Sequence, residues 1–262
     1  MRILVTNDDG IGARGLEGLV SALRDLGEVW TVAPDREQSA ASHALTLRDP
    51  LRVTQHSERE FSVSGTPTDC VLVSVRGIHG LLEPCPDLVV SGINHGPNMG
   101  DDVTYSGTVA AAFEGRLLGL PAVAFSNVEW KPRHMETSAH MARVIVETLV
   151  ARGLPRDTLL NVNIPDLPLE RIRGIRVTRL GCRVYRDVIV AKVDPRGRPY
   201  FWIGGDPPIW ESHDDTDFSA VSEGYVSITP LQTDWTDGRA LAALGTWRFA
   251  LPEAQRPEVG GG

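Results

Sequence analysis

The strongest constraint on the fold is an alternation of two hydrophobic patterns along the first part of this 262-residue chain. The apolar, β-branched run Arg2–Thr6 precedes leucines and valines that recur at helical spacing between Leu16 and Leu26. Further strands are expected at 28–33, 87–91, 121–126 and 159–164, and further helices at 107–118 and 136–152. Apolar strands separated by helices predict an α/β fold in which a mostly parallel sheet carries helices on both faces.

The pattern changes in two other regions. Residues 45–65 hold short alternating stretches that indicate a hairpin-like excursion. After Gly174, the stretches IRVTRLG, RVYRDVIVAKV, RPYFWIGG and EGYVSITPL indicate antiparallel strands joined by Gly and Pro turns. We therefore predict an α/β core at 1–173, a smaller β-rich appendage at 174–251 that ends in a helix beginning at Asp237, and a disordered tail at 252–262. The aromatic residues of the appendage suit either an oligomer contact or a local hydrophobic cluster: Tyr200, Phe201, Trp202 and Trp210.

Charge and cysteine content narrow the classes of function. A formal net charge of -8 and a pI near 5.4 argue against a stable complex with nucleic acid. The three cysteines are far apart and form no C-x-x-C pair, which favours a reduced, cytoplasmic protein without a disulfide framework. No run of about 18 apolar residues occurs, so we expect no membrane association.

Two adjacent acids end the first strand, in the stretch ILVTNDDG. Ligands of parallel sheets bind beyond the carboxyl ends of the strands, which is where Asp8 and Asp9 are expected. The following GIGARG has the glycine spacing of a dinucleotide-binding loop, with Asp35 about 20 residues beyond it. Two carboxylates before the first glycine would repel the pyrophosphate, so this explanation conflicts with the chemistry. A phosphorylated receiver module needs a later strand-end Asp and a Lys, which the sequence does not supply there.

A hard divalent cation is the third explanation. Ser39 in PDREQSAAS and Asn94 in VVSGINHG follow neighbouring strands and add oxygen donors to the acidic pair. Carboxylate, hydroxyl and amide oxygens suit Mg²⁺, Mn²⁺ or Ca²⁺. The predicted metal ligands are Asp8, Asp9, Ser39 and Asn94. Such a cation would neutralise the two acids and provide positive charge for a phosphate.

The stretch DDVTYSGTVAAAFEG opens a helix with small and hydroxyl-bearing residues. Free N–H groups at Ser106, Gly107 and Thr108 could hold a phosphate, although an ordinary helix cap explains the same residues. Asn98 lies shortly before them and is assigned to the same pocket. The expected substrate-binding residues are Asn98, Ser106, Gly107 and Thr108.

These motifs resemble, in order and across most of the chain, those of the SurE survival-protein family of metal-dependent 5′/3′-nucleotidases: ILVTNDDG, APDREQSAAS, GTPTDCV, VVSGINHGPNMGDDVTYSGTVAAAFEG and EGYVSITPL. The resemblance implies a Rossmann-like core, one divalent cation per subunit on the four predicted ligands, and hydrolysis of nucleoside 5′- and 3′-monophosphates. For some members it also implies hydrolysis of short polyphosphate. It further implies homodimers or homotetramers that exchange their C-terminal segments.

The predicted catalytic residues are Asp8, Asn98 and Ser106. Asp8 is expected to orient or deprotonate the attacking water, while Asn98 and Ser106 offset charge on the phosphoryl oxygens. A covalent aspartyl phosphate is the rival mechanism. His95 departs from the family pattern, which has a small residue there. The acids Asp214, Asp215 and Asp217 form either a solvated loop or a second ion site.

Overall fold

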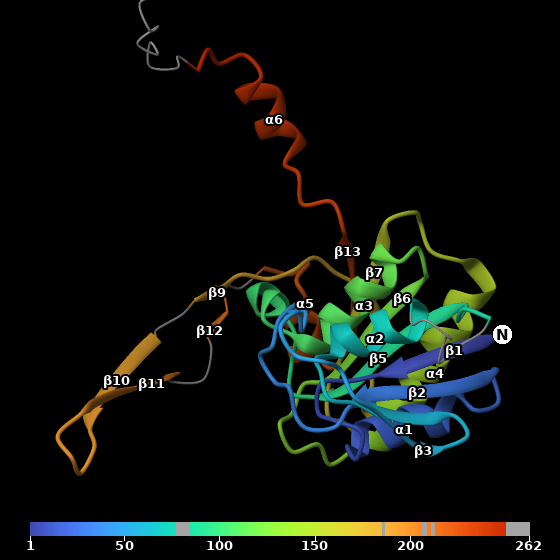
Figure 1. The fold of residues 1–262 in the computed structure, drawn as a ribbon. Helices are drawn as coiled ribbons and strands as arrows, with labels where there is room; N and C mark the ends of the chain where they lie inside the picture. The colour runs from blue at the N-terminus through green and yellow to red at the C-terminus, as the bar shows by residue number, and fades with distance from the viewer. Residues whose placement is uncertain (77–83, 185–186, 206–208, 211–212, 250–262) are drawn as a thin grey trace, which may run out of the picture.

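A nine-stranded sheet forms the centre of the computed structural model, which describes residues 1–76, 84–184, 187–205, 209–210 and 213–249 (Figure 1). In sheet order the strands are β3 (Val53–Ser57), β4 (Glu60–Val63), β2 (Glu28–Pro34), β1 (Arg2–Thr6), β5 (Leu88–His95), β6 (Ala122–Asn127), β7 (Thr158–Ile164), β13 (Val226–Gln232) and β8 (Ile175–Val177). Every pairing from β4 through β7 is parallel, whereas β3 and β13 pair antiparallel with β4 and β7.

Helices cover both faces of this sheet, as the alternation predicts. The four long ones are α1 (Arg14–Leu23), α2 (Pro67–Arg76), α3 (Gly107–Leu117) and α4 (Met135–Arg152). Because successive side chains of a strand point to opposite faces, Ile3 and Val5 pack with α1 and α4, while Leu4 packs with α2 and α3. The predicted α/β fold is confirmed, and the excursion at 45–65 contains the β3–β4 hairpin, which extends the sheet edge.

Strand β5 differs from the expectation in length. It continues to His95 instead of ending near residue 91, with a break in its pairing to β6 between Ser91 and Asn94. Gly92 lies at this break with φ +127°, and a Cβ there would meet the Phe125 carbonyl oxygen at 2.3 Å. Asn94 and His95 therefore belong to the end of a strand rather than to a loop after it.

Two of the stretches after Gly174 pair with the main sheet. IRVTRLG and EGYVSITPL, assigned to the appendage by their pattern, supply β8 and β13 of the main sheet. The reason is packing, since Val226 of β13 is fully buried in the hydrophobic cluster that also contains residues of α1 and α4. The segments outside the main sheet are β9 (Arg183–Val184), β10 (Asp187–Val193), β11 (Pro199–Gly205), β12 (Ile209–Trp210), α5 (Asp217–Ser222) and α6 (Gly238–Leu244), with short 3-10 turns at Gly100–Thr104 and Leu169–Arg171. The three-part division of the chain remains a prediction.

Two segments of the C-terminal region project from the body, the β10–β11 hairpin and α6 (Figure 1). Asp237 caps α6 as expected, accepting hydrogen bonds from the N–H groups of Arg239 and Ala240. Phe201 and Trp202 are exposed on β11, whereas the Trp210 side chain and residues 252–262 lie outside the described residues. In the described part of the chain, none of the helices is both long and apolar enough to cross a membrane.

Candidate functional site

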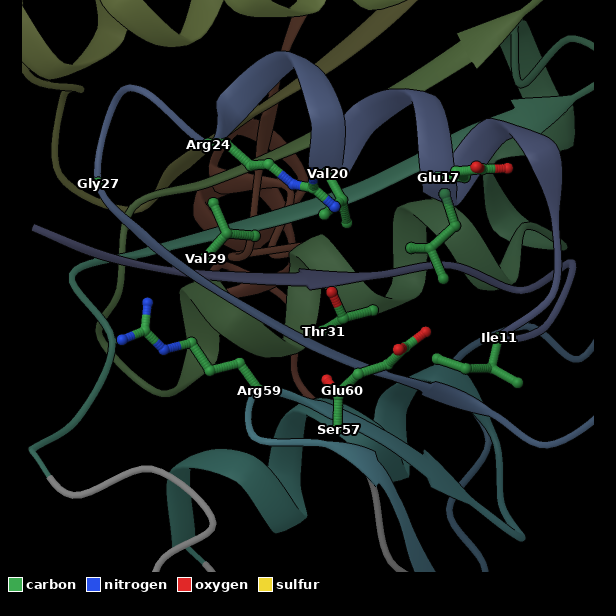
Figure 2. Close-up of a pocket in the computed structure, with 11 residues that line it drawn as sticks. Ile11, Glu17, Val20, Arg24, Gly27, Val29, Thr31, Ser57, Arg59 and Glu60 are labelled. Atoms are coloured by element: carbon green, nitrogen blue, oxygen red, sulfur yellow. The ribbon is translucent and has the colours of Figure 1, made fainter.

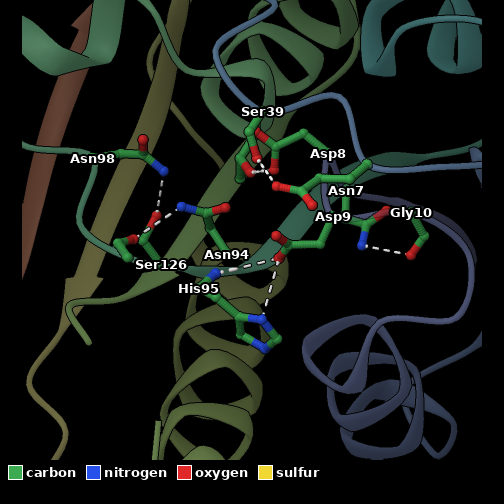
Figure 3. A network of polar contacts seen from close by, with 12 residues as sticks. Asn7, Asp8, Asp9, Gly10, Ser39, Asn94, His95, Asn98 and Ser126 are labelled. Carbon is green, nitrogen blue, oxygen red and sulfur yellow. Dashed lines mark hydrogen bonds and ion pairs between the residues drawn. The ribbon is translucent and has the colours of Figure 1, made fainter. Parts of the chain in front are cut away.

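The acidic pair lies where four segments meet at the carboxyl edge of the sheet. Asp8 and Asp9 follow β1, and the backbone N–H of Gln38, in the loop after β2, donates to the Asp8 carbonyl at 2.7 Å. The end of β5 reaches Asp9 through His95, and the start of α3 reaches Asp8 through Thr108. Elements distant in sequence thus converge on two neighbouring carboxylates, as Figure 3 shows.

Asp8 is buried against the amino end of α3. Its Oδ2 accepts the Thr108 backbone N–H at 3.1 Å, and its Oδ1 accepts the Thr108 hydroxyl. Gly107 is required by this close approach, because a Cβ there would lie 2.9 Å from the Asp8 Cβ. A carboxylate has about four lone pairs, so Asp8 keeps acceptor capacity beyond these two bonds.

Asp9 faces the end of β5. Its Oδ2 accepts the His95 backbone N–H at 3.2 Å and lies 3.8 Å from the His95 Nδ1. Burial, with the nearby positive charge of Arg14, lowers the pKa of His95, so this imidazole is largely neutral at pH 7 and does not compensate the carboxylate.

Burial raises the pKa of both acids to about 6, because a desolvated carboxylate is less stable when charged. For Asp8 the opposing bonds from Thr108 and the repulsion from Asp9 are smaller influences. Among the described residues, no arginine or lysine forms an ion pair with either acid. The pair is therefore a concentration of partly desolvated negative charge that no arginine or lysine in the described part of the protein neutralises.

Ser39 and Asn94 lie beside this pair, with oxygens that can serve as ligands (Figure 3). The Ser39 hydroxyl donates to Glu37 Oε1 at 2.8 Å, and the Asn94 amide nitrogen donates to the Gly96 carbonyl at 2.9 Å. Both bonds leave the side-chain oxygen available as an acceptor. The described residues hold no group of three or more His, Cys, Asp or Glu that could bind a metal. A cation here would need the hydroxyl and amide oxygens as well as the two carboxylates, which is the donor set that Mg²⁺, Mn²⁺ and Ca²⁺ accept.

Asn98 is held by buried asparagines of β7 that the sequence analysis did not single out. Asn163 accepts from the Asn98 backbone N–H and donates to the Asn98 carbonyl, both at 2.9 Å, and Asn161 donates to the same carbonyl at 2.8 Å. The Asn98 side-chain nitrogen donates to Ser126 Oγ at 2.8 Å and keeps a second hydrogen for a ligand. The signal in the sequence was two asparagines in alternation inside the apolar strand LLNVNI.

The predicted phosphate ligands at the start of α3 make different contacts in the structure. Ser106 is the N-cap, and its Oγ accepts the Val109 N–H at 3.0 Å, which leaves the hydroxyl proton free to donate. Thr108 directs both its hydroxyl and its N–H at Asp8, so in this structure it fixes that carboxylate. A direct contact between Thr108 and substrate remains a prediction.

The acidic loop at 214–217 is split by the fold. Asp215 is exposed and pairs with Arg179 at 2.8 Å. Asp217 is fully buried and accepts the backbone N–H groups of Gly100, Gly181 and Phe218, each at 2.8 Å. Asp217 thus anchors the chain just after Asn98 to the C-terminal region, a structural role that its sequence context does not indicate.

Two of the three glycines of GIGARG, Gly10 and Gly15, have structural roles. Gly10 adopts φ +96°, and a Cβ on Gly15 would lie 2.0 Å from the Ile93 carbonyl oxygen, so α1 packs directly on β5. A cavity of about 360 Å³ lies next to this segment, between α1 and the strands β2, β3 and β4 (Figure 2), and neither acid of the pair lines it. Its lining mixes acids and bases, Glu17 and Glu60 with Arg24 and Arg59, and includes none of the predicted site residues.

The fold and the site together define an α/β protein with adjacent aspartates at the carboxyl edge of its sheet, facing the amino end of a helix. The family model described as "Survival protein SurE" matches residues 3–187. This chain belongs to the SurE family.

Relatives of this family match nearly the whole chain. A protein of Geobacter sulfurreducens named 5′-nucleotidase SurE is 51% identical over 99% of this chain and 97% of its own length. A protein of Aeromonas hydrophila with the same name is 53% identical over 94% of this chain and 98% of its own length. The crystal structure of the SurE protein from Aquifex aeolicus is 44% identical, covers 93% of this chain and 98% of that one, and has a TM-score of 0.84. The resemblance noted from the motifs is confirmed.

Proposed function

We propose that this chain is a divalent-metal-dependent phosphomonoesterase that hydrolyses nucleoside 5′-monophosphates to nucleoside and phosphate. The observation that carries this proposal is the adjacent carboxylates of Asp8, which is buried against the amino end of α3, and Asp9, which is partly buried, in a chain whose relatives are named 5′-nucleotidases. Activity on 3′-monophosphates and on short polyphosphate belongs to the same proposal.

The oxygens of Asp8, Asp9, Ser39 and Asn94 would hold one divalent cation. Their chemistry fits, because the two acids are desolvated without a cationic partner among the described residues, and hydroxyl and amide oxygens complete the set. When bound, the cation would supply positive charge next to the phosphate and favour ionisation of a water.

The protein's own groups would orient the substrate and the water. Asn98 and Ser106 each have a free hydrogen to donate to phosphoryl oxygens, and the amino end of α3 adds its partial positive charge. Asp8, fixed by Thr108, would orient or deprotonate the attacking water. A covalent aspartyl phosphate is the rival, and single turnover in ¹⁸O-water separates the two, because label in an enzyme carboxylate would exclude direct attack by water.

The deciding experiment is a phosphate-release screen over nucleoside 5′- and 3′-monophosphates, sugar phosphates and polyphosphate, with and without a chelator. We expect release from nucleoside monophosphates that stops with the chelator and returns when Mg²⁺ or Mn²⁺ is added in excess. Release that survives complete chelation would contradict the metal-dependent proposal. Tight NAD binding without any phosphate release would favour the dinucleotide alternative.

Assembly and location complete the proposal. A homodimer or homotetramer with exchanged C-terminal segments is supported by the projecting β10–β11 hairpin and α6, both of which expose apolar side chains. A cytoplasmic location is supported by three free cysteines, Cys70, Cys85 and Cys182.

A further inference from the structure

A second hollow is lined by His95, the residue that contacts Asp9. It has a volume of about 260 Å³ and is lined by Arg14, His95, Trp130, Lys131, Pro132 and Met135. His95 belongs to both sites, since its backbone N–H donates to Asp9 while its ring lines the hollow. A ligand with one end at Asp8 and Asp9 therefore has this hollow as a neighbouring space for its other end.

Trp130 is the main aromatic surface of the hollow. It is 73% exposed, although an indole is a large apolar group that usually gains by burial. A Cβ built on Gly96 would lie 2.8 Å from Trp130 Cε3, so the ring lies directly against the Gly96 backbone. The Gly96 carbonyl in turn accepts from Asn94, which connects the position of the indole to a predicted metal ligand.

The charge of the hollow is opposite to that of the chain. The protein has a net charge of -8, yet Arg14 and Lys131 both line this space. Within the described ranges, no carboxylate pairs with either of these two cations. Both side chains have only hydrogen-bond donors, so they suit a ligand that presents acceptor atoms, such as the ring nitrogens and carbonyls of a nucleobase.

We propose that this hollow binds the base of the nucleoside monophosphate, stacked on Trp130, with its acceptor atoms facing Arg14 and Lys131. The inference rests on the proposed function, and it assigns binding residues to the base, for which the proposed function names none. Stacking on an aromatic side chain accepts any base, so Trp130 would provide affinity for nucleosides in general.

The test compares two substrates of the full-length protein with saturating Mg²⁺ or Mn²⁺. Adenosine 5′-monophosphate carries a base, and ribose 5-phosphate presents the same phosphate without one. We expect the wild type to prefer the nucleotide in kcat/KM by roughly 5- to 150-fold, the range that one base stacking on an aromatic ring provides. Trp130→Ala should lose most of this preference through a higher KM for the nucleotide, with ribose 5-phosphate hydrolysed as before.

Two control variants separate stacking from general damage. Trp130→Phe keeps an aromatic face and should retain most of the preference. Trp202→Ala removes another exposed tryptophan, on β11 outside the hollow, and should leave the preference unchanged. An unchanged preference in Trp130→Ala, or an equal loss on both substrates, would overturn the inference.

Product inhibition gives a readout that does not depend on phosphate binding. Trp130→Ala should raise the inhibition constant of adenosine by a similar factor and leave that of inorganic phosphate unchanged. If the wild type hydrolyses neither substrate, the proposed function fails, and calorimetric titration of adenosine into wild type and Trp130→Ala still decides the inference. Equal adenosine affinity in the two proteins, or no binding to either, would refute it.

Discussion

Asp8 and Asp9 define the chemistry at the scale of single residues. Asp8 is buried and Asp9 is partly buried, desolvation raises the pKa of each to about 6, and neither has an arginine or lysine partner among the described residues. Uncompensated buried charge destabilises a fold, so a protein that keeps it needs an external partner to offset it. This arrangement leads to two predictions at this scale.

The first prediction concerns Asp9→Asn. The change preserves shape and removes one charge, so the fold should persist while cation binding weakens. We expect kcat/KM for nucleoside monophosphates to fall by about a hundredfold or more, measured as phosphate release. Circular dichroism should match the wild type. Near-normal turnover in this variant would count against the acidic pair as the active centre.

The second prediction concerns the stability of the metal-free protein as a function of pH. Because the folded-state pKa of each acid is raised from 3.8 to about 6, the pair's contribution is fully present below about pH 4 and is lost as pH rises through 6. The free energy of unfolding, measured by urea denaturation with chelator, should therefore fall over this interval by on the order of 3 kcal/mol, mostly from the buried Asp8, since water still reaches Asp9 and reduces its share.

A matched comparison isolates the pair from other titrating groups. Asp9→Asn should show a smaller fall between pH 4 and pH 7, and added Mn²⁺ should stabilise the wild type at pH 7 more than this variant. Identical pH profiles for the two proteins would mean that burial of Asp9 does not govern this effect.

Sequence reasoning located residues that carry distinctive chemistry but missed those that hold them in place. Asp8, Asp9, Ser39 and Asn94 were visible because carboxylates and oxygen donors follow strands. The contacts of Asn163 and Asp217 were not visible, because a buried asparagine or aspartate is specified by which backbone groups the tertiary fold brings to it, up to 117 residues away.

At the scale of elements, β7 positions the loop that follows β5. Its two buried asparagines form three hydrogen bonds with the backbone of Asn98, so the strand fixes the orientation of a predicted phosphate ligand. The start of α3 does the same for Asp8 through Thr108. The site therefore consists of strand and helix ends that come together only when the sheet assembles.

The prediction at this scale is for Asn163→Ala. It leaves the Asn98 N–H without its partner and should lower the free energy of unfolding by about 1–3 kcal/mol. It should also lower kcat/KM, because Asn98 loses its fixed orientation. Asn161→Ala removes one bond to a carbonyl that keeps another donor, so its effects should be smaller. Equal effects of the two variants would contradict this account.

Element types were predictable and their ends were not. The alternation of apolar runs correctly indicated β1, β2, β6 and β7 and the helices α1, α3 and α4, because each buries a continuous apolar face. The extension of β5 past Gly92 was missed because glycine there interrupts the pattern. Strands β8 and β13 were assigned to the appendage because an alternating pattern identifies a strand but does not identify the strand with which it pairs.

At the scale of the whole molecule, apolar side chains are exposed on segments that leave the body. Helix α6 exposes Leu241 and Leu244, and the residues that follow it expose Trp247 and Phe249. Exposed apolar groups on a projecting segment favour association with another surface, and the proposal assigns them to a second copy of the chain.

The corresponding prediction is for Leu241→Glu. A charge on α6 should weaken assembly, so light scattering coupled to size exclusion should show a lower mass than for the wild type at the same concentration. Leu117→Glu changes a similarly exposed leucine, 55% against 63%, at the end of α3 and should leave the mass unchanged. A wild type that is monomeric at high micromolar concentration would reject the assembly proposal.

The hydrogen bonds of Asp217 bear on the stage of protein synthesis at which the site can form. The carboxylate that fixes Gly100 is translated 117 residues after it, and β13 follows later still. A nascent chain that already carries Asp8, Asp9, Asn98 and α3 therefore lacks the carboxylate that joins the backbone at Gly100 to Gly181 and the start of α5. We therefore expect the enzyme to be inactive until nearly the whole polypeptide has left the ribosomal exit tunnel. Truncated translation products should not hydrolyse nucleotides.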